Sequence, residues 1–232
     1  MTPHILGTSI IRLFDFFRQG GFFMVLLLLC SVTSIMVMFL RGVALRRSVV
    51  MPPAIEQEIE SLQPGDNTDA IVKLARLVRG DESPLARIAQ VGLQHLQWPK
   101  AENVEAVQTK ARHEIVHLES GLFILEIIVG IAPLLGLLGA VSGLVTVFAN
   151  FGNSVESDPH IIAKGISEAL STTIVGIAVA IPSLIAYSYF SKKVETMAAE
   201  METLIADLIA KCYFQKKRRD ARTERAEVFE GI

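Results

Sequence analysis

The fold of this chain is decided by two stretches, GIAPLLGLLGAVSG at residues 130–143 and ISEALSTTIVG at residues 166–176. They lie in apolar segments, 122–148 and 169–190, that are each long enough to cross a bilayer, because ~20 helical residues rising ~1.5 Å each span the ~30 Å of hydrocarbon. Small residues recur in them every three or four positions: Ala132, Gly136, Ala140 and Gly143, then Ala169, Thr173, Gly176, Ala180 and Ser183. Such stripes let helix backbones approach closely in lipid, so we expect both helices to pack tightly.

Three hydroxyl residues, Ser171, Thr172 and Thr173, stand in a row in the second stretch. A helix offers its own backbone carbonyls to only some of them. One interpretation is ordinary helix packing, and the other is a hydroxyl that faces a wet or polar lumen. The residues by themselves leave both open.

The composition agrees with a small membrane protein. The 232 residues are 51% hydrophobic, with a net charge of −2 and a mean hydropathy of +0.44, and no soluble core is needed to explain this apolar content. The sequence contains no P-loop, dinucleotide fingerprint or basic nucleic-acid patch. Cys30 and Cys212 lie in different surroundings and suggest no disulfide framework. We therefore expect no cofactor and no nucleic-acid partner.

Charge clusters set the expected topology. An uncharged run at residues 22–40 is followed by Arg41, Arg46 and Arg47, and the third apolar segment is closed by Lys192 and Lys193. Basic residues flanking a span belong on the cytoplasmic side. The first run is also too long for the apolar core of a signal peptide. The sequence predicts an uncleaved anchor and three spans, with the N-terminus outside and the C-terminus inside.

The chain is thus expected to be an all-α integral membrane protein of seven parts. In order these are an outer or interfacial segment (1–20), the first span (21–41), a cytoplasmic helical region (42–121), the second span (122–148), an outer loop (149–165), the third span (166–191) and a cytoplasmic helical extension with a tail (192–232). Residues 4–18 suit a short helix in the membrane interface, or a sticky tail. The cytoplasmic region predicts helices at about 54–62, 67–79 and 84–97 from its proline and glycine punctuation.

Both core spans are expected to continue into the cytoplasm as arms. From residue 101 apolar residues recur every three or four positions and enter the second span without a break: Val104, Val107, Ala111, Ile115, Leu118, Leu122 and Leu125. After the third span the same spacing runs from Val194 to Cys212. The sequence predicts one continuous helix in each case and a pairing of the two arms.

One motif points to a different class of protein. Residues 113–117 read HEIVH, a match to the zinc-protease pattern in which two histidines one turn apart bind zinc and the glutamate is a general base. His113 and His117 each lie about 200° beyond Ala111 and Ile115, on the face opposite the packing stripe. A protease also needs a third ligand, and no companion motif follows. We expect a chance match and no metal site, with His113 and His117 the residues to test.

The core motifs resemble those of a known family. The phrases APLLGLLG at 132–139 and GISEAL at 165–170, followed by Thr173, Gly176 and AIP at 180–182, look like the signature helices of the MotA/TolQ/ExbB proton-channel family, over about residues 112–193. The resemblance implies a homopentamer that surrounds the single transmembrane helices of a partner of the ExbD, TolR or MotB type and passes protons inward while doing mechanical work. One departure is Ala140, where the family usually has a pore-lining threonine.

The resemblance also assigns roles to residues. Thr173 would line the pore beside the partner's carboxylate and Glu168 would admit the proton at the outer mouth, with Thr172 and Ala140 as the neighbouring pathway positions. An alternative for Glu168 is an acid favoured by the dipole at a helix N-terminus. The residues expected to pack or bend the helices are Pro133, Gly136, Gly139, Gly143, Gly176, Ala180 and Pro182.

The middle of the three spans contains no Asp, Glu, His, Lys or Arg. Glu126 lies near the inner end of the second span, and Glu168 lies near the outer end of the third. A proton relay therefore needs a carrier from a partner helix, which in the family is an Asp. We expect a non-enzymatic, multi-pass stator subunit of the bacterial inner membrane that acts indirectly on a TonB- or Tol-type envelope protein. The compact cytoplasmic region favours an ExbB or TolQ type, while a flagellar or gliding stator, the zinc protease, and sodium in place of protons remain the alternatives.

Overall fold

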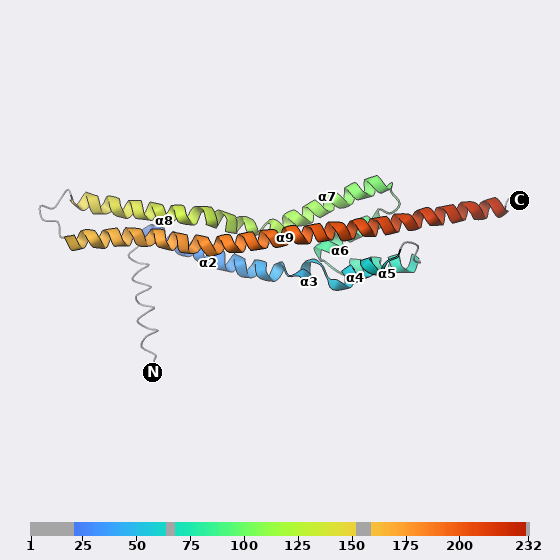
Figure 1. Cartoon of the computed structure of the whole chain (residues 1–232), viewed down its shortest axis with the longest axis horizontal. Coiled ribbons are helices and arrows are strands. Elements are labelled where there is room, and N and C mark those ends of the chain that lie inside the picture. The colour runs from blue at the N-terminus through green and yellow to red at the C-terminus, as the bar shows by residue number, and fades with distance from the viewer. Residues whose placement is uncertain (1–20, 64–67, 152–158, 231–232) are drawn as a thin grey trace, which may run out of the picture. The chain divides into compact units, whose positions relative to one another are not determined.

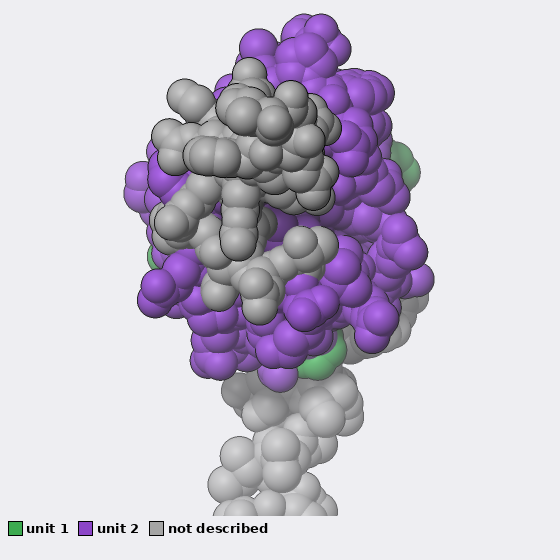
Figure 2. Space-filling view, turned by 90° about the vertical axis from the view of Figure 1, so that its right-hand side faces the viewer, with its two compact units in different colours: residues 1–41, 121–189 green, residues 42–120, 190–232 purple. Residues whose placement is uncertain are grey.

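The computed structural model describes residues 21–63, 68–151 and 159–230, and within these ranges the chain is helical and forms no strand (Figure 1). The all-α prediction is confirmed. The interfacial helix expected at residues 4–18 lies outside the described ranges. The chain forms two compact units, residues 1–41 with 121–189 and residues 42–120 with 190–232, which Figure 2 colours separately.

The first unit contains the helices that are long and apolar enough to cross a membrane. These are α2 (Gly21–Ala44), α8 (Leu122–Phe151) and the first part of α9 (Pro159–Glu230). Many of their large apolar side chains are exposed, such as Phe39 at 73% and Ile174 at 66%. Exposed apolar surface on this scale marks contact with lipid or with other subunits. The three predicted spans are confirmed as helices.

Small residues and one polar contact hold α2 in this unit. Leu27 of α2 is fully buried in a cluster with Ile128, Ala132 and Ala180. Ser34 Oγ lies 2.6 Å from Ser183 Oγ of α9. Ser183 donates its own hydrogen to the carbonyl of Val179 at 2.7 Å, so Ser34 is the donor of the bond between the helices. A buried hydrogen bond of this kind joins helices where lipid offers no hydrophobic drive.

The second unit is a set of short helices around the later part of α9. They are α3 (Arg47–Val50), α4 (Pro53–Ser61), α5 (Thr68–Arg79), α6 (Pro84–Gln94) and α7 (Lys100–Glu119). Helix α6 begins where Ser83 Oγ accepts a hydrogen bond from the backbone N–H of Ala86 and Pro84 occupies the first turn, both strong start signals. The three helices predicted for this region are confirmed within a few residues.

Helix α9 supplies the apolar stripe on which this unit packs. Its buried residues recur every three or four positions: Val194, Met197, Met201, Ile205, Leu208 and Cys212. Helices α6, α7 and α9 meet at Gly92, where an added Cβ would lie 3.3 Å from Val107 Cγ2 and 3.7 Å from Ile209 Cγ1. Lys211 Nζ donates to the carbonyls of Ile59 and Glu60 at 3.0 and 3.2 Å and so caps the end of α4. The predicted continuation of the third span as an apolar arm is confirmed.

The matching prediction for the second span is wrong in one respect. The regular helix is interrupted at Ser120 and Gly121, so α7 and α8 are separate helices. Ser120 Oγ donates to the carbonyl of His117, three residues earlier, at 2.8 Å. Glycine has a low helix propensity because it loses the most backbone freedom. The apolar repeat continues across Ser120 and Gly121, but the regular helical structure of the backbone is interrupted there.

A buried polar group ties the end of α6 to α7 and α9. Asn103 is fully buried, and its Nδ2 donates to the carbonyl of Gly92 at 3.0 Å and to the Tyr213 hydroxyl at 3.2 Å. The Tyr213 hydroxyl donates in turn to the carbonyl of Trp98 at 2.8 Å. The carbonyls near the end of α6 therefore find partners from two other helices.

Tyr213→Phe should lower the stability of this unit by about 1 kcal/mol, because it removes both hydroxyl contacts and leaves the ring in place. The thermal unfolding midpoint of the purified protein measures the effect, with Tyr187→Phe, in the other unit, as the control. An unchanged midpoint for Tyr213→Phe would mean that the polar contacts contribute nothing net.

Candidate functional site

In the first unit the backbones of α8 and α9 come into direct contact. A Cβ added at Gly176 would lie 2.6 Å from the carbonyl oxygen of Ala132 and 3.1 Å from Gly136 Cα. One added at Gly136 would lie 2.9 Å from the carbonyl oxygen of Thr172. The obstructing atoms belong to backbone and cannot swing away. Only glycine at both positions permits this crossing, which is the arrangement small-residue stripes produce in membranes.

The contact continues along both helices. A Cβ at Gly139 would meet Thr172 Cβ at 3.0 Å, and one at Gly143 would meet Ala169 Cβ at 3.0 Å. Ala140 and Ala180 are buried in the same unit, whereas Pro133 is half-buried and Pro182 is exposed. The structure thus brings together the small residues of the two stripes within one chain.

The three neighbouring hydroxyls have different surroundings. Ser171 donates to the carbonyl of Ser167 in its own helix at 2.8 Å. Thr172 is 2% exposed, with Oγ1 2.8 Å from the carbonyl oxygen of Ala169 and 3.1 Å from that of Gly136. Thr173 is half-buried, and its Oγ1 lies 3.3 Å from the same Gly136 carbonyl. Thr172 therefore lies inside the helix pair and Thr173 lies at its edge.

The carboxylates lie toward the ends of these helices. Glu168 is half-buried one turn before Thr172 on α9, and Glu126 is exposed in the first turns of α8. Ala140 is 7% exposed, so the position where the resemblance implies a pore-lining threonine is covered by its own chain here. The geometry supplies a tight helix pair in which Thr172 and Thr173 are the hydroxyls that lie beside the Gly136 carbonyl. In the described part of α8 after Glu126, and in α9 between Glu168 and Lys192, there is no Asp, Glu, His, Lys or Arg.

The model of one protein family, described as the MotA/TolQ/ExbB proton channel family, matches residues 81–203, which is more than half of the chain. The chain belongs to this family. The match covers the whole α8–α9 crossing and begins before α6, further toward the N-terminus than the motifs at 112–193 indicated.

Individual proteins with similar sequences carry ExbB and TolQ names, in agreement with this family. The chain is similar to the ExbB-like 1 biopolymer transport protein of Synechocystis sp., with 32% identity over 180 residues, 76% of this chain and 69% of the relative. It is 27% identical to the biopolymer transport protein ExbB of Neisseria gonorrhoeae over 84% of this chain and 92% of that one. It is 28% identical to the Tol-Pal system protein TolQ of Pseudomonas aeruginosa over 78% and 81% of the two chains. With three membrane-length helices, this member of the proton channel family is a multi-pass membrane protein.

The protease-like motif of this family member has a different role in the structure. Glu114, which would be the general base, is 2% exposed and accepts bonds from Arg87 Nε at 3.0 Å and Arg87 Nη2 at 2.6 Å. Lys110 Nζ lies 2.7 Å from Oε1, the same carboxylate oxygen that accepts from Arg87 Nε. His113 and His117 are exposed. Among the described residues no three potential ligands gather around a metal position. The glutamate and the histidines thus serve different faces of α7.

The two neighbouring cations, Arg87 and Lys110, keep the buried carboxyl of Glu114 ionised. Burial by itself raises the pKa of Glu114, but the hydrogen bonds and charges of Arg87 and Lys110 outweigh it and hold the pKa below its ordinary value. The hydrogen bond to Glu114 likewise raises the pKa of Arg87. The apolar repeat predicted for α7 did not include Glu114 and Asn103, although both side chains are buried. Glu114 follows Ala111 by three residues and Val107 by seven, so it lies on the same face of the helix. That spacing, with Lys110 four residues earlier, was the available signal.

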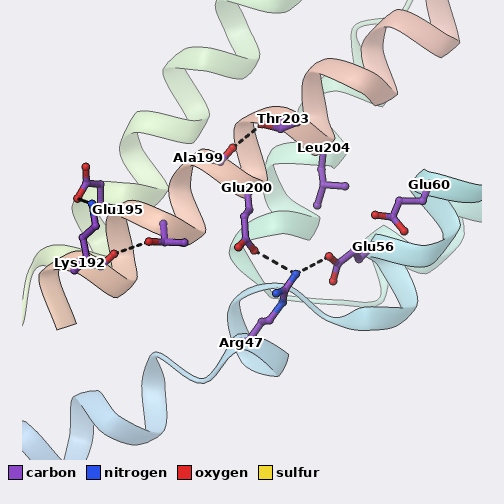
Figure 3. A pocket seen from close by; sticks show the side chains of 10 residues that line it. Arg47, Glu56, Glu60, Lys192, Glu195, Ala199, Glu200, Thr203 and Leu204 are labelled. Atoms are coloured by element: carbon purple, nitrogen blue, oxygen red, sulfur yellow. Dashed lines mark hydrogen bonds and ion pairs between the residues drawn. The ribbon is translucent and has the colours of Figure 1, made fainter. Parts of the chain in front are cut away.

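The second unit also has a shallow surface hollow of about 520 Å³, shown in Figure 3. Arg47 of α3 reaches between Glu56 of α4 and Glu200 of α9, at 2.7 and 3.2 Å. Lys192 and Glu195 pair at 2.9 Å on its rim. Ion pairs occupy most of its charged groups, so the hollow joins helices and is not a candidate ligand site.

Alanine substitution at the crossing should destabilise the first unit. Gly136→Ala and Gly176→Ala force backbones apart, and we expect each to cost about 1–3 kcal/mol, the usual range for overpacking. Thermal unfolding in detergent measures the loss. Gly130→Ala is the matched control, because nothing lies within 4 Å of an added Cβ there, and it should be neutral or slightly stabilising. Equal midpoints for all three variants would contradict the close crossing.

The Glu114 cluster should make the stability of the second unit depend on pH. Because the pKa of Glu114 is lower in the folded state than its ordinary value of 4.5, the stabilisation is complete above that pH and is lost as the pH falls through the folded pKa. Glu114→Gln should cost about 2–3 kcal/mol near neutral pH, since it leaves Arg87 and Lys110 without their carboxylate. It should also flatten the acid limb of the unfolding midpoint against pH. Glu102→Gln, at an exposed position of the same helix, should keep the wild-type profile.

Proposed function

We propose that this chain is a stator subunit of a proton channel in the bacterial inner membrane and works with a single-span partner of the ExbD/TolR type. The observation that carries the proposal is that the middle of the three spans contains no Asp, Glu, His, Lys or Arg side chain. A proton cannot cross hydrocarbon without such a group or a water path. The partner helix therefore supplies an Asp as the carrier, and this chain supplies the walls.

The proposed walls are the edges of the α8–α9 pair. Thr173 is half-buried beside the Gly136 carbonyl and is the hydroxyl placed to meet a partner carboxylate or its water. Thr172 lies inside the pair and holds it together. Glu168, on the same helix nearer the outer end, admits the proton. Ala140 adds no polar contact to this path.

A channel of this kind needs several copies of the chain. Exposed apolar residues on α8 and α9, Leu134, Leu137, Ile174 and Ile181 among them, provide surface for neighbouring copies and for lipid. We infer a homopentamer around the partner helices. The basic clusters after α2 and at Lys192–Lys193 support a topology in which the C-terminus and the second unit are cytoplasmic and the N-terminus is outside.

The energy available suits mechanical work. Each proton that falls through the membrane potential releases ~2.3 kcal/mol per 100 mV. Several protons per cycle suffice to shift the partner helices against the subunit ring. The partner then transmits this movement to a TonB- or Tol-type envelope protein, in line with the ExbB and TolQ names of the relatives.

Thr173→Val should sharply lower proton flux while leaving the complex intact, because valine keeps the shape and removes the polar contact. Thr172→Val is the matched control. Its hydroxyl bonds backbone carbonyls inside the pair, so its loss should cost about 1 kcal/mol of stability with little effect on flux. Proton uptake into proteoliposomes that contain the chain and its coexpressed partner measures the difference, with complex formation checked by size.

Wild-type flux in both variants would overturn the pore assignment of Thr173. Equal loss of flux in both, with the complex intact, would show that the channel runs along a different face of α9.

A further inference from the structure

The two histidines of the protease-like motif have no role in the proposed transport. His113 and His117 are both exposed, one turn apart on α7, with ring centres 5.3 Å apart and ring planes inclined by 56°. They lie in the last two turns of the helix, which ends at Glu119. Two imidazoles at this spacing on an open helix face form a chelating pair.

The distance between the rings fits one metal ion. Imidazole nitrogen binds zinc at about 2.0–2.1 Å, which puts the ion about 3.2 Å from the centre of each ring. For rings 5.3 Å apart, the two metal–ring directions then enclose about 110°, close to the tetrahedral angle that zinc adopts. The separation of the rings therefore allows both imidazoles to bind the same ion.

The rest of the motif shows what kind of site this is. Glu114 is buried and held by Arg87 and Lys110, so it belongs to the fold and not to the metal. In the part of the chain that the structure describes, no third histidine, cysteine or carboxylate joins the pair. Water would fill the remaining positions, so the ion exchanges readily and has no general base beside it.

The expectation of no metal site rested on the third protein ligand that a catalytic zinc needs, and an exchangeable ion held by two histidines does not need it. In place of that expectation, we propose that His113 and His117 bind a divalent transition-metal ion, zinc above all, on the exposed face of α7. Imidazole also suits copper and nickel, whereas calcium and magnesium prefer oxygen ligands. The bound ion links positions one turn apart and so clamps the last two turns of α7. These turns come directly before the break at Ser120, whose hydroxyl donates to the carbonyl of His117. Metal binding thus stabilises the helix end next to the break.

The test uses the full-length chain, purified without a polyhistidine tag and titrated with ZnCl₂ in a calorimeter. We expect one zinc ion per chain and slower hydrogen exchange of the amides at residues 113–119 when zinc is present, because an ion that binds only the folded helix stabilises it. Magnesium at the same concentration should do neither. His113→Ala and His117→Ala should each abolish both effects, and His95→Ala, at a histidine of the α6 end, should retain them.

A spacing control separates chelation from the mere presence of two histidines. Arg112→His combined with His113→Ala keeps two exposed histidines, but at five residues apart they point about 140° away from each other around the helix. This variant should lose the zinc effects. Equal zinc binding by the wild type and the spacing control, no zinc binding by the wild type, or binding that leaves the exchange of residues 113–119 unchanged would each overturn the proposal.

Discussion

The backbone contact between α8 and α9 is the constraint on which the membrane unit depends. Gly136 and Gly176 let the two helices touch without side chains between them, and in lipid this contact replaces the hydrophobic drive that would hold helices together in water. The same approach brings the Gly136 carbonyl within reach of Thr172 and Thr173. The close backbone contact therefore determines both the helix packing and the hydrogen bonds to the Gly136 carbonyl. A larger residue at either glycine alters both.

A tight pair of this kind suits a channel wall. Helices that meet along glycine and alanine keep their larger apolar residues on the outer faces, where these residues are exposed. The pair excludes water from its own interior because Thr172, Ala140 and Ala180 are buried there. Under the proposed function, the proton therefore moves along the edge of the pair and is carried by a group of the partner helix.

The second unit is held together by a different kind of interaction. Its helices are joined at three polar points: Glu114 with Arg87 and Lys110, Asn103 with Tyr213, and Lys211 with the end of α4. Buried polar groups are costly unless paired, so they favour one arrangement of the helices over others. The protease-like motif belongs to this system, because its glutamate is one of the pairing groups.

The sequence by itself determined the three spans, the small-residue stripes and the long third helix, since apolar length and three-four spacing depend on local geometry alone. It also placed His113 and His117 on the open face of α7 correctly. Only the tertiary structure decided that Thr172 faces inward while Thr173 lies at the edge, because adjacent hydroxyls differ by about 100° around a helix and the partner helix chooses between them. The break at Ser120 and Gly121 is a local feature, at a glycine of low helix propensity, across which the apolar repeat continues. The burial of Glu114 was decided by the tertiary structure, because the guanidinium of Arg87 that pairs with its carboxylate is 27 residues away, where a periodic pattern does not register it.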